Sequence, residues 1–334
     1  MTLMRRLILV LGLWLAFPAS GTAQEASLVY NVGGKLDKSF NESAHHGIQV
    51  ARQASGITVG EYEVVSESGR LETVRAAARN ADLVIVVGFA FRDVLAQVAG
   101  ENPGKRFAII DAAVDLPNVM SVIFKEQEGA FLVGVMAAMA STSGTVGFIG
   151  GMDSPVIRRF QAGFEQGVIH AVPTVRVIAE MLDRTPKGFT DPMAGYLAAK
   201  RQIAAGADVL FAAAGTSGLG VYQAAQNAVV LAIGVDSDQT YLFPGTMLTS
   251  MVKDVGRSVE RILTDGAKGR WSAGLRVIGL ADGGMSAAIG RFNRGLVSPA
   301  MMQAVEKARR DIIDGRIRVD GEPKEVAVPY PSGN

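Results

Sequence analysis

The stretch Val229-Val230-Leu231-Ala232-Ile233-Gly234-Val235-Asp236-Ser237-Asp238-Gln239-Thr240 indicates the fold class of this chain. An apolar run of strand length ends abruptly, and two acids follow it, two residues apart. In an open α/β sheet, buried strands present ligand-binding side chains at their carboxyl ends. Three interpretations are open. Asp236 could bind a polar ligand, could be a nucleophile because Asp-x-Asp-x-Thr matches an aspartyl-phosphate phosphatase motif, or could cap a helix or turn together with Asp238.

Apolar strand patterns alternate with helical patterns along most of the chain. The strands are continuously apolar rather than alternating with period two, which predicts parallel sheets covered by helices on both faces. We expect strands at 27–32, 61–65, 83–87, 106–110, 120–124, 145–149, 175–181, 208–211, 229–235, 246–252 and 276–280. We expect helices at 39–54, 71–81, 91–99, 128–140, 155–168, 192–205, 218–227, 254–266 and 299–313, with Asp191 as the N-cap of the sixth.

The alternation restarts near residue 145, so the chain contains two sets of similar size. We therefore predict an α/β protein of two doubly wound parallel-sheet lobes, joined by a multi-strand hinge with a ligand cleft between them. The expected crossovers are 124–128, 238–246 and about 269–276. The first lobe would comprise 24–124 plus about 246–270, the second 125–240 plus about 275–320, and 321–334 would form a C-terminal tail.

The first 23 residues have the pattern of a secretory signal peptide. Arg5 and Arg6 precede an apolar segment at 7–17, which is too short to span a bilayer, and small residues before position 24 suit cleavage after Ala23. The alternative is a short membrane anchor. No cysteine follows the apolar segment, so a lipid anchor on a processed cysteine is excluded. We expect a mature protein that is soluble, exported to a periplasm and not lipid-anchored.

Composition excludes several kinds of function. The 334-residue chain is 49% hydrophobic and contains no cysteine, which excludes disulfides, thiol catalysis and thiolate metal sites. Its three histidines make a histidine-rich metal site improbable. The net charge of +1 becomes −1 when Arg5 and Arg6 are removed with the signal peptide. A near-neutral chain has no large electrostatic surface for nucleic acid, so we expect no nucleic-acid partner.

Three motifs suggest chemistry but lack their usual context. The phosphatase motif at Asp236 comes late in the chain, and no paired acidic motif follows it to hold Mg²⁺. Ser250-Met251-Val252-Lys253 matches S-x-x-K, but a strand would place the serine and the lysine on opposite faces. The loop Gly215-Thr216-Ser217-Gly218-Leu219-Gly220 has the wrong spacing for a dinucleotide site. It predicts either backbone N–H groups facing a ligand or a plain tight turn. We expect no enzyme activity, no catalytic residue, no cofactor and no metal.

Five side chains lie where predicted strands end or helices begin: Phe40, Asn41, Asp111, Asp236 and Lys253. An aromatic ring can stack on a base, an amide can pair with the edge of a heterocycle, carboxylates accept hydroxyl protons and lysine donates. Together these groups would suit a flat, polar molecule. Each acid alone could equally cap a turn, and Phe40 could be a core residue at a helix start.

At these residues the chain resembles the basic membrane protein family of substrate-binding proteins, which includes purine-nucleoside receptors of ABC importers. The resemblance rests on collinear segments that cover nearly all of the mature chain. They are Asp37-Lys38-Ser39-Phe40-Asn41, 126–134, Gly188-Phe189-Thr190-Asp191-Pro192, 206–209 with 213–215, 233–239, and Ser250-Met251-Val252-Lys253-Asp254.

The resemblance implies a type I periplasmic-binding fold that closes on a nucleoside, and we expect a purine nucleoside. It also implies a membrane permease as partner, and we expect the receptor to be a monomer. The family's base-stacking aromatic falls on Phe40 and its partner on Phe189, with polar contacts to base and sugar falling on Asn41, Asp111, Asp236 and Lys253. The full set of predicted ligand-binding residues is Asp37, Ser39, Phe40, Asn41, Asp111, Phe189, Gly215, Asp236 and Lys253.

The chain departs from the family pattern in two places. Many members are lipoproteins, whereas this chain has no cysteine. His45-His46 stands where a bulky aromatic is expected; we interpret these histidines as solvated helix residues or as packing against the first strand. Two other functions remain open: an exported hydrolase that uses Asp236 or Ser250, and a binding protein that feeds a signalling receptor instead of a permease.

Overall fold

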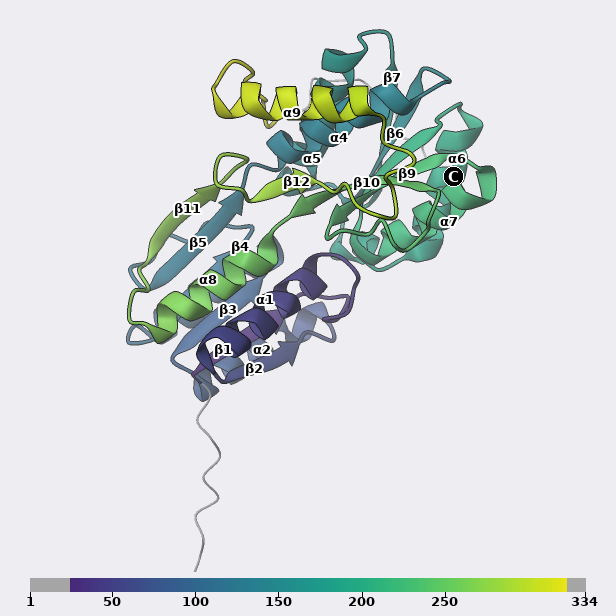
Figure 1. Cartoon of the computed structure of the whole chain (residues 1–334). Coiled ribbons are helices and arrows are strands. Elements are labelled where there is room, and N and C mark those ends of the chain that lie inside the picture. The colour runs from purple at the N-terminus through teal and green to yellow at the C-terminus, as the bar shows by residue number, and fades with distance from the viewer. Residues whose placement is uncertain (1–24, 323–334) are drawn as a thin grey trace, which may run out of the picture.

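The computed structural model describes residues 25–322, which fold into two α/β lobes (Figure 1). The predicted signal peptide and residues 323–334 of the predicted tail lie outside the described residues. Within the described range, each lobe contains a six-stranded sheet with helices on both faces. The prediction of two doubly wound, mainly parallel sheets is therefore confirmed.

The sheet of the first lobe has the strand order β2-β1-β3-β4-β5-β11, and all its neighbouring strands are parallel. Helices α1 (Phe40–Ser55) and α8 (Val255–Ala267) cover one face. Helices α2 (Arg70–Asn80) and α3 (Arg92–Glu101) cover the other. The strands are β1 (Ala26–Tyr30), β2 (Val59–Glu63), β3 (Leu83–Val87), β4 (Arg106–Ile110), β5 (Val119–Phe124) and β11 (Gly274–Ile278).

The second lobe repeats this arrangement with the order β7-β6-β8-β9-β10-β12, in which only the short β12 is antiparallel. One face is covered by α4 (Glu126–Ala140), α5 (Pro155–Ala171) and α9 (Pro299–Ile313). The other is covered by α6 (Pro192–Ala204) and α7 (Gly218–Ala228). The strands are β6 (Thr145–Met152), β7 (Arg176–Asp183), β8 (Val209–Ala213), β9 (Leu231–Asp236), β10 (Met247–Lys253) and β12 (Met285–Ala287).

Three segments connect the lobes: β5 to α4, β10 to α8, and β11 to β12. The first agrees with the predicted crossover at 124–128. The predicted crossovers at 238–246 and 269–276 are wrong, because each joins elements of the same lobe. Residues 247–253 accordingly belong to the second sheet and residues 274–278 to the first. Neighbouring parallel strands are usually joined through a helix. Because no helix lies between β9 and β10, the sequence pattern favoured a crossover between the lobes at 238–246.

Helix α1 is held against the hinge by a close helix crossing. At Gly47, a Cβ atom would lie 2.1 Å from the carbonyl oxygen of Gly256 in α8, so only glycine permits this approach. The backbone N–H of Gly256 also donates to Ser43 Oγ in α1 at 3.1 Å. Because α8 follows directly after a crossover, this contact fixes the start of α1, and with it Phe40, relative to the hinge.

No helix within residues 25–322 is long and apolar enough to cross a membrane. The capping prediction for α6 is confirmed, since Asp191 Oδ1 accepts from the backbone N–H of Ala194 at 2.9 Å and Pro192 opens the helix. The cap involves only residues that are close in sequence, so the Asp-Pro pair was sufficient to predict it.

Candidate functional site

A pocket opens between the two lobes, where the carboxyl ends of their parallel strands face each other. It encloses about 670 Å³ of space between protein atoms, including open solvent at its mouth. Both lobes contribute, through the segments that follow their parallel strands, as expected for an open α/β sheet. The lining residues are Asn31, Val32, Asp37, Phe40, Asn41, Gly88, Phe89, Asp111, Val156, Ile157, Phe160, Phe189, Ala213, Gly215, Thr216, Val235, Asp236 and Lys253.

Eight of the nine predicted site residues line this one pocket, although 216 residues separate Asp37 from Lys253 in the sequence. Ser39 does not line it. Its side chain is fully buried, and its Oγ donates to Asp236 Oδ2 at 2.7 Å. Ser39 thus makes a contact between the lobes instead of facing the pocket.

Asp37 and Asn41 line the pocket, but their side chains form hydrogen bonds to backbone groups within the first lobe. The Asp37 carboxylate accepts three backbone N–H groups at the start of α1, from Ser39, Asn41 and Glu42, at 2.9–3.0 Å. The Asn41 amide donates to the carbonyl oxygens of Asn31 and Gly34 at 3.2 and 3.0 Å. Both side chains therefore shape the turn that carries Phe40, and a carboxylate at a helix N-terminus is favoured there.

Asn31 is a pocket residue that sequence reasoning missed. It directly follows β1, and its Oδ1 accepts from the N–H of Val32 at 2.9 Å. Its Nδ2 group lies beside Gly88, another residue that lines the pocket, and can donate to a ligand. The strand expected at 27–32 includes Asn31, so the argument from strand ends that singled out Asp111 did not apply to it; in the structure β1 ends at Tyr30.

Aromatic rings from both lobes line the pocket. Phe40 and Phe89 come from the first lobe, and Phe160 and Phe189 from the second. The ring of Phe189 lies against Gly151, where a Cβ atom would be 2.4 Å from ring carbon Cδ1. Phe89 is only partly buried and reaches the pocket. Aromatic rings of both lobes thus line the pocket, where they can pack against a flat ring.

Lys253 lies at the centre of a buried charge network beside the hinge. Its side chain is 1% exposed, and its Nζ lies 2.7 Å from Asp111 and 2.9 Å from Glu126 Oε1. Glu126 Oε2 in turn accepts from Arg159 Nε at 2.6 Å. Asp111 belongs to the first lobe, while Glu126 opens α4 just after a crossover. This network therefore joins the first lobe to two crossover segments.

Burial acts to lower the pKa of Lys253, but the carboxylates of Asp111, Glu126 and Asp236 outweigh it and hold this pKa above its ordinary value. The ammonium also lies 5.0–5.6 Å from the ring centres of Phe40, Phe124 and Phe160. The lysine is thus charged at neutral pH and already neutralised by protein carboxylates.

Asp111 and Asp236 occupy equivalent positions in the two lobes. Each stands at the end of the fourth strand of its sheet, with a left-handed backbone at φ +72° and +65°. Aspartate tolerates this conformation better than most residues. Both oxygens of Asp111 lie near Lys253 Nζ, but only Oδ2 has hydrogen-bond geometry. Asp111 Oδ1 is buried and has no hydrogen-bond partner among the described residues, but it lies 2.7 Å from the Lys253 ammonium and so takes part in the ion pair.

Asp236 has an unusual acidity. Burial raises its pKa to about 7, although the ammonium of Lys253 and the hydrogen bond from Ser39 oppose this change. A carboxyl group in this state changes charge near neutral pH. Perturbed acids of this kind gather at functional sites.

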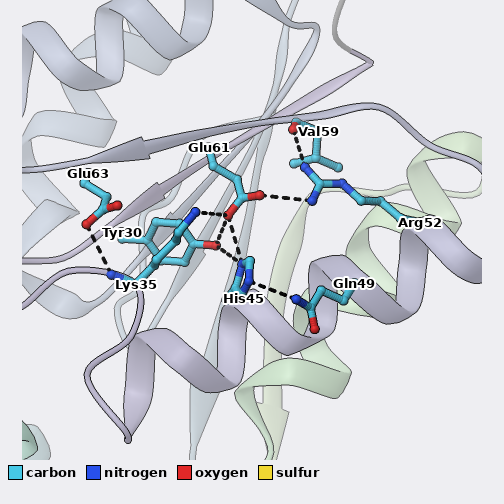
Figure 2. Close-up of polar contacts among 8 residues, drawn as sticks. All are labelled: Tyr30, Lys35, His45, Gln49, Arg52, Val59, Glu61 and Glu63. Atoms are coloured by element: carbon cyan, nitrogen blue, oxygen red, sulfur yellow. Dashed lines mark hydrogen bonds and ion pairs between the residues drawn. The ribbon is translucent and has the colours of Figure 1, made fainter.

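His45 belongs to a polar cluster on the outer edge of the first lobe (Figure 2). Its Nδ1 lies 2.9 Å from Glu61 Oε2, which also accepts from the Tyr30 hydroxyl at 2.7 Å. Arg52 pairs with the other oxygen of Glu61 at 3.0 Å. His45 therefore packs against β1, as one of the two interpretations held, and His46 is exposed. Neither histidine lines the pocket.

The catalytic alternatives find little support in this geometry. Ser250 is fully buried, does not line the pocket, and its Oγ accepts the backbone N–H of Gln239 at 3.0 Å. Asp238 is exposed and accepts from the N–H and hydroxyl of Thr240, which makes it a turn residue. Within residues 25–322, no group of three or more His, Asp or Glu side chains could hold a metal ion.

A sequence model of the family described as "ABC transporter substrate-binding protein PnrA-like" matches residues 24–322. The chain belongs to this family. The predicted resemblance is therefore confirmed. Substrate-binding proteins of ABC transporters bind a small molecule and deliver it to a membrane permease. Membership in this family therefore implies two partners, a small-molecule ligand and a permease.

Named relatives support the same family membership. "ABC transporter nucleoside-binding protein BmpA" of Lactococcus lactis is 31% identical over 331 residues, with 90% of this chain and 92% of the relative covered. "Basic membrane protein A" of Borreliella afzelii is 32% identical over 302 residues, with 88% of each chain covered. The crystal structure of an ABC-transporter solute-binding protein from Aeropyrum pernix superposes with a TM-score of 0.80 at 28% identity, covering 88% of this chain and 92% of that one. These likenesses support the type I periplasmic-binding fold.

Proposed function

We propose that this protein is the periplasmic receptor of an ABC importer and that it binds a nucleoside, with purine nucleosides preferred, by closing its two lobes around it. One observation carries the proposal. A single interlobe pocket combines aromatic rings from both lobes with the carboxylates of Asp111 and Asp236. The rings suit a flat base, and the carboxylates suit the hydroxyl groups of a sugar. The Lactococcus relative named as nucleoside-binding supports the same ligand class.

Export through the predicted signal peptide at 1–23 is part of this proposal. A ligand stabilises the closed arrangement only to the extent that it binds that arrangement more tightly than the open one. In this account the closed pair of lobes is the surface that the permease recognises, and the receptor acts as a monomer without catalysis.

Phe40→Ala should weaken binding of adenosine by about 1–3 kcal/mol, by analogy with bases stacked on aromatic side chains. This corresponds to roughly a 5- to 150-fold rise in Kd. Isothermal titration of the variant and the natural protein with adenosine measures the effect. Phe292→Ala is a matched control, because Phe292 is 38% exposed and does not line the pocket. Equal affinities for Phe40→Ala and Phe292→Ala would remove Phe40 from the site.

A further inference from the structure

The two lobes touch along a short seam beside the pocket, between Lys38–Ser39 of the first lobe and Val235–Gln239 of the second. Four hydrogen bonds cross this seam, and one of them runs from Ser39 Oγ to the carbonyl oxygen of Val235 at 3.3 Å. Ser39 Oγ donates to Asp236 Oδ2 at 2.7 Å, and Ser237 Oγ donates to the carbonyl oxygen of Ser39 at 2.9 Å. Gln239 Nε2 donates to the carbonyl oxygen of Lys38 at 2.8 Å. The side chains of Ser39 and Gln239 are 0% and 1% exposed, so water is excluded from these two contacts.

Gln239 is anchored in the second lobe by its other end. Its Oε1 accepts from the Tyr222 hydroxyl at 2.7 Å and from the backbone N–H of Val235 at 2.9 Å. A backbone N–H can only donate, so this contact fixes which end of the amide is oxygen. The amide nitrogen must then face the carbonyl oxygen of Lys38. Gln239 thereby ties the strand end that carries Asp236 to the facing turn of the first lobe.

The facing turn carries pocket groups of its own. Asp37 holds the start of α1 through three backbone N–H groups, and Phe40 is the first residue of that helix. The seam therefore fixes Phe40 of one lobe relative to Asp236 of the other. Yet Ser39, Ser237 and Gln239 do not themselves line the pocket.

We infer that Ser39, Ser237 and Gln239 form an interlobe clasp, which stabilises the closed arrangement of the lobes and so sets ligand affinity without touching the ligand. These three are positioning residues. When only the closed arrangement binds tightly, the apparent affinity falls in proportion to the closed population. The affinity part of this inference rests on the proposed function, whereas the effect on the lobes does not.

Ser237→Ala removes one bond of the clasp and nothing from the pocket. One hydrogen bond contributes about 0.5–1.5 kcal/mol, which corresponds to a 2- to 10-fold rise in the Kd for adenosine. Ser39→Ala/Ser237→Ala should raise it further. Thr249→Val is the matched control, because it removes a buried hydroxyl bond within the second lobe, from Thr249 Oγ1 to Ala288 O at 2.8 Å. The control should lower the melting temperature but leave the Kd unchanged.

The absence of cysteine from the chain allows a direct readout of closure. Cysteines placed at Arg79 and Thr174 would carry a dye pair, because both positions are exposed and lie near β2 and β7, the sheet edges farthest from the crossovers. Energy transfer is then measured without ligand and with saturating adenosine.

In the ligand-free protein, Ser237→Ala and the double variant should lower the transfer efficiency, while Thr249→Val should match the natural protein. Natural-like transfer in both clasp variants would overturn the inference, as would an unchanged Kd. If the natural protein binds no nucleoside, the proposed function fails, but the ligand-free transfer efficiencies still decide whether the clasp holds the lobes.

Discussion

Replacing Lys253 with methionine is expected to lower the free energy of unfolding by about 3–5 kcal/mol at pH 7, because removing one partner of a buried ion pair leaves uncompensated charges. Methionine keeps most of the side-chain volume, so lost packing contributes little. The charges left behind are the carboxylates of Asp111 and Glu126, which lie 2.7 and 2.9 Å from the lysine nitrogen. Chemical unfolding of the ligand-free proteins measures the difference.

The triple variant Lys253→Met/Asp111→Asn/Glu126→Gln separates charge from packing. It removes both orphaned carboxylates, and neutral replacement of a buried charge cluster is often tolerated. Most of the lost stability should return, while adenosine binding should not, because Asp111 and Lys253 both line the pocket. A single Lys253→Met variant as stable as the natural protein would contradict the buried network.

Asp236→Asn is expected to weaken binding and to stabilise the ligand-free protein at the same time. Loss of a charged acceptor should cost about 1.5–3 kcal/mol of adenosine binding at pH 8, or roughly 10- to 150-fold in Kd. Asparagine suits this position because it tolerates the left-handed backbone at φ +65° and keeps an oxygen for the bond from Ser39.

The stability effect follows from the direction of the pKa shift. Burial raises the pKa of Asp236 from 3.8 to about 7, so the folded protein holds this proton more tightly than the unfolded chain. Its contribution to stability is therefore present below about pH 4 and is lost as the pH rises to about 7.

Relative to the natural protein, Asp236→Asn should gain about 2–4 kcal/mol of stability between pH 4 and pH 8. Unfolding curves of both proteins at the two pH values measure this gain. Parallel pH profiles for the two proteins would show that burial does not hold the proton on Asp236. An unchanged Kd at pH 8 would show that its carboxylate does not meet the ligand.

Long apolar segments carried most of the information about the fold. The bounds expected for β3, β4 and α9 match the structure, because continuous apolar runs and a clear helical period leave few alternatives. The three-residue strand β12 was not predicted, since so short a segment has no period of its own. Lobe membership was harder, because a connection such as 238–246 has no local feature that tells a turn within a lobe from a passage between lobes.

The candidate site was predictable where it depends on strand ends. Asp111 and Asp236 follow buried strands, and parallel strands bring such positions to one edge of a sheet. Ser39 was predicted to contact the ligand, but its side chain is buried against Asp236 of the other lobe. No local feature of the sequence indicates this contact between the lobes. Glu126 was missed because an acid in the first turn of a helix is common on a protein surface, and only the folded chain places it against Lys253.

The most direct test of the central claim is a thermal-shift screen of the mature, natural protein against purine and pyrimidine nucleosides, free bases, ribose and small amides. A ligand that binds only the folded state raises the melting temperature with its concentration. We predict the largest rise with a purine nucleoside, a smaller one with its free base and none with ribose alone. A sugar or an amide that raises the melting temperature while every nucleoside leaves it unchanged would contradict the account.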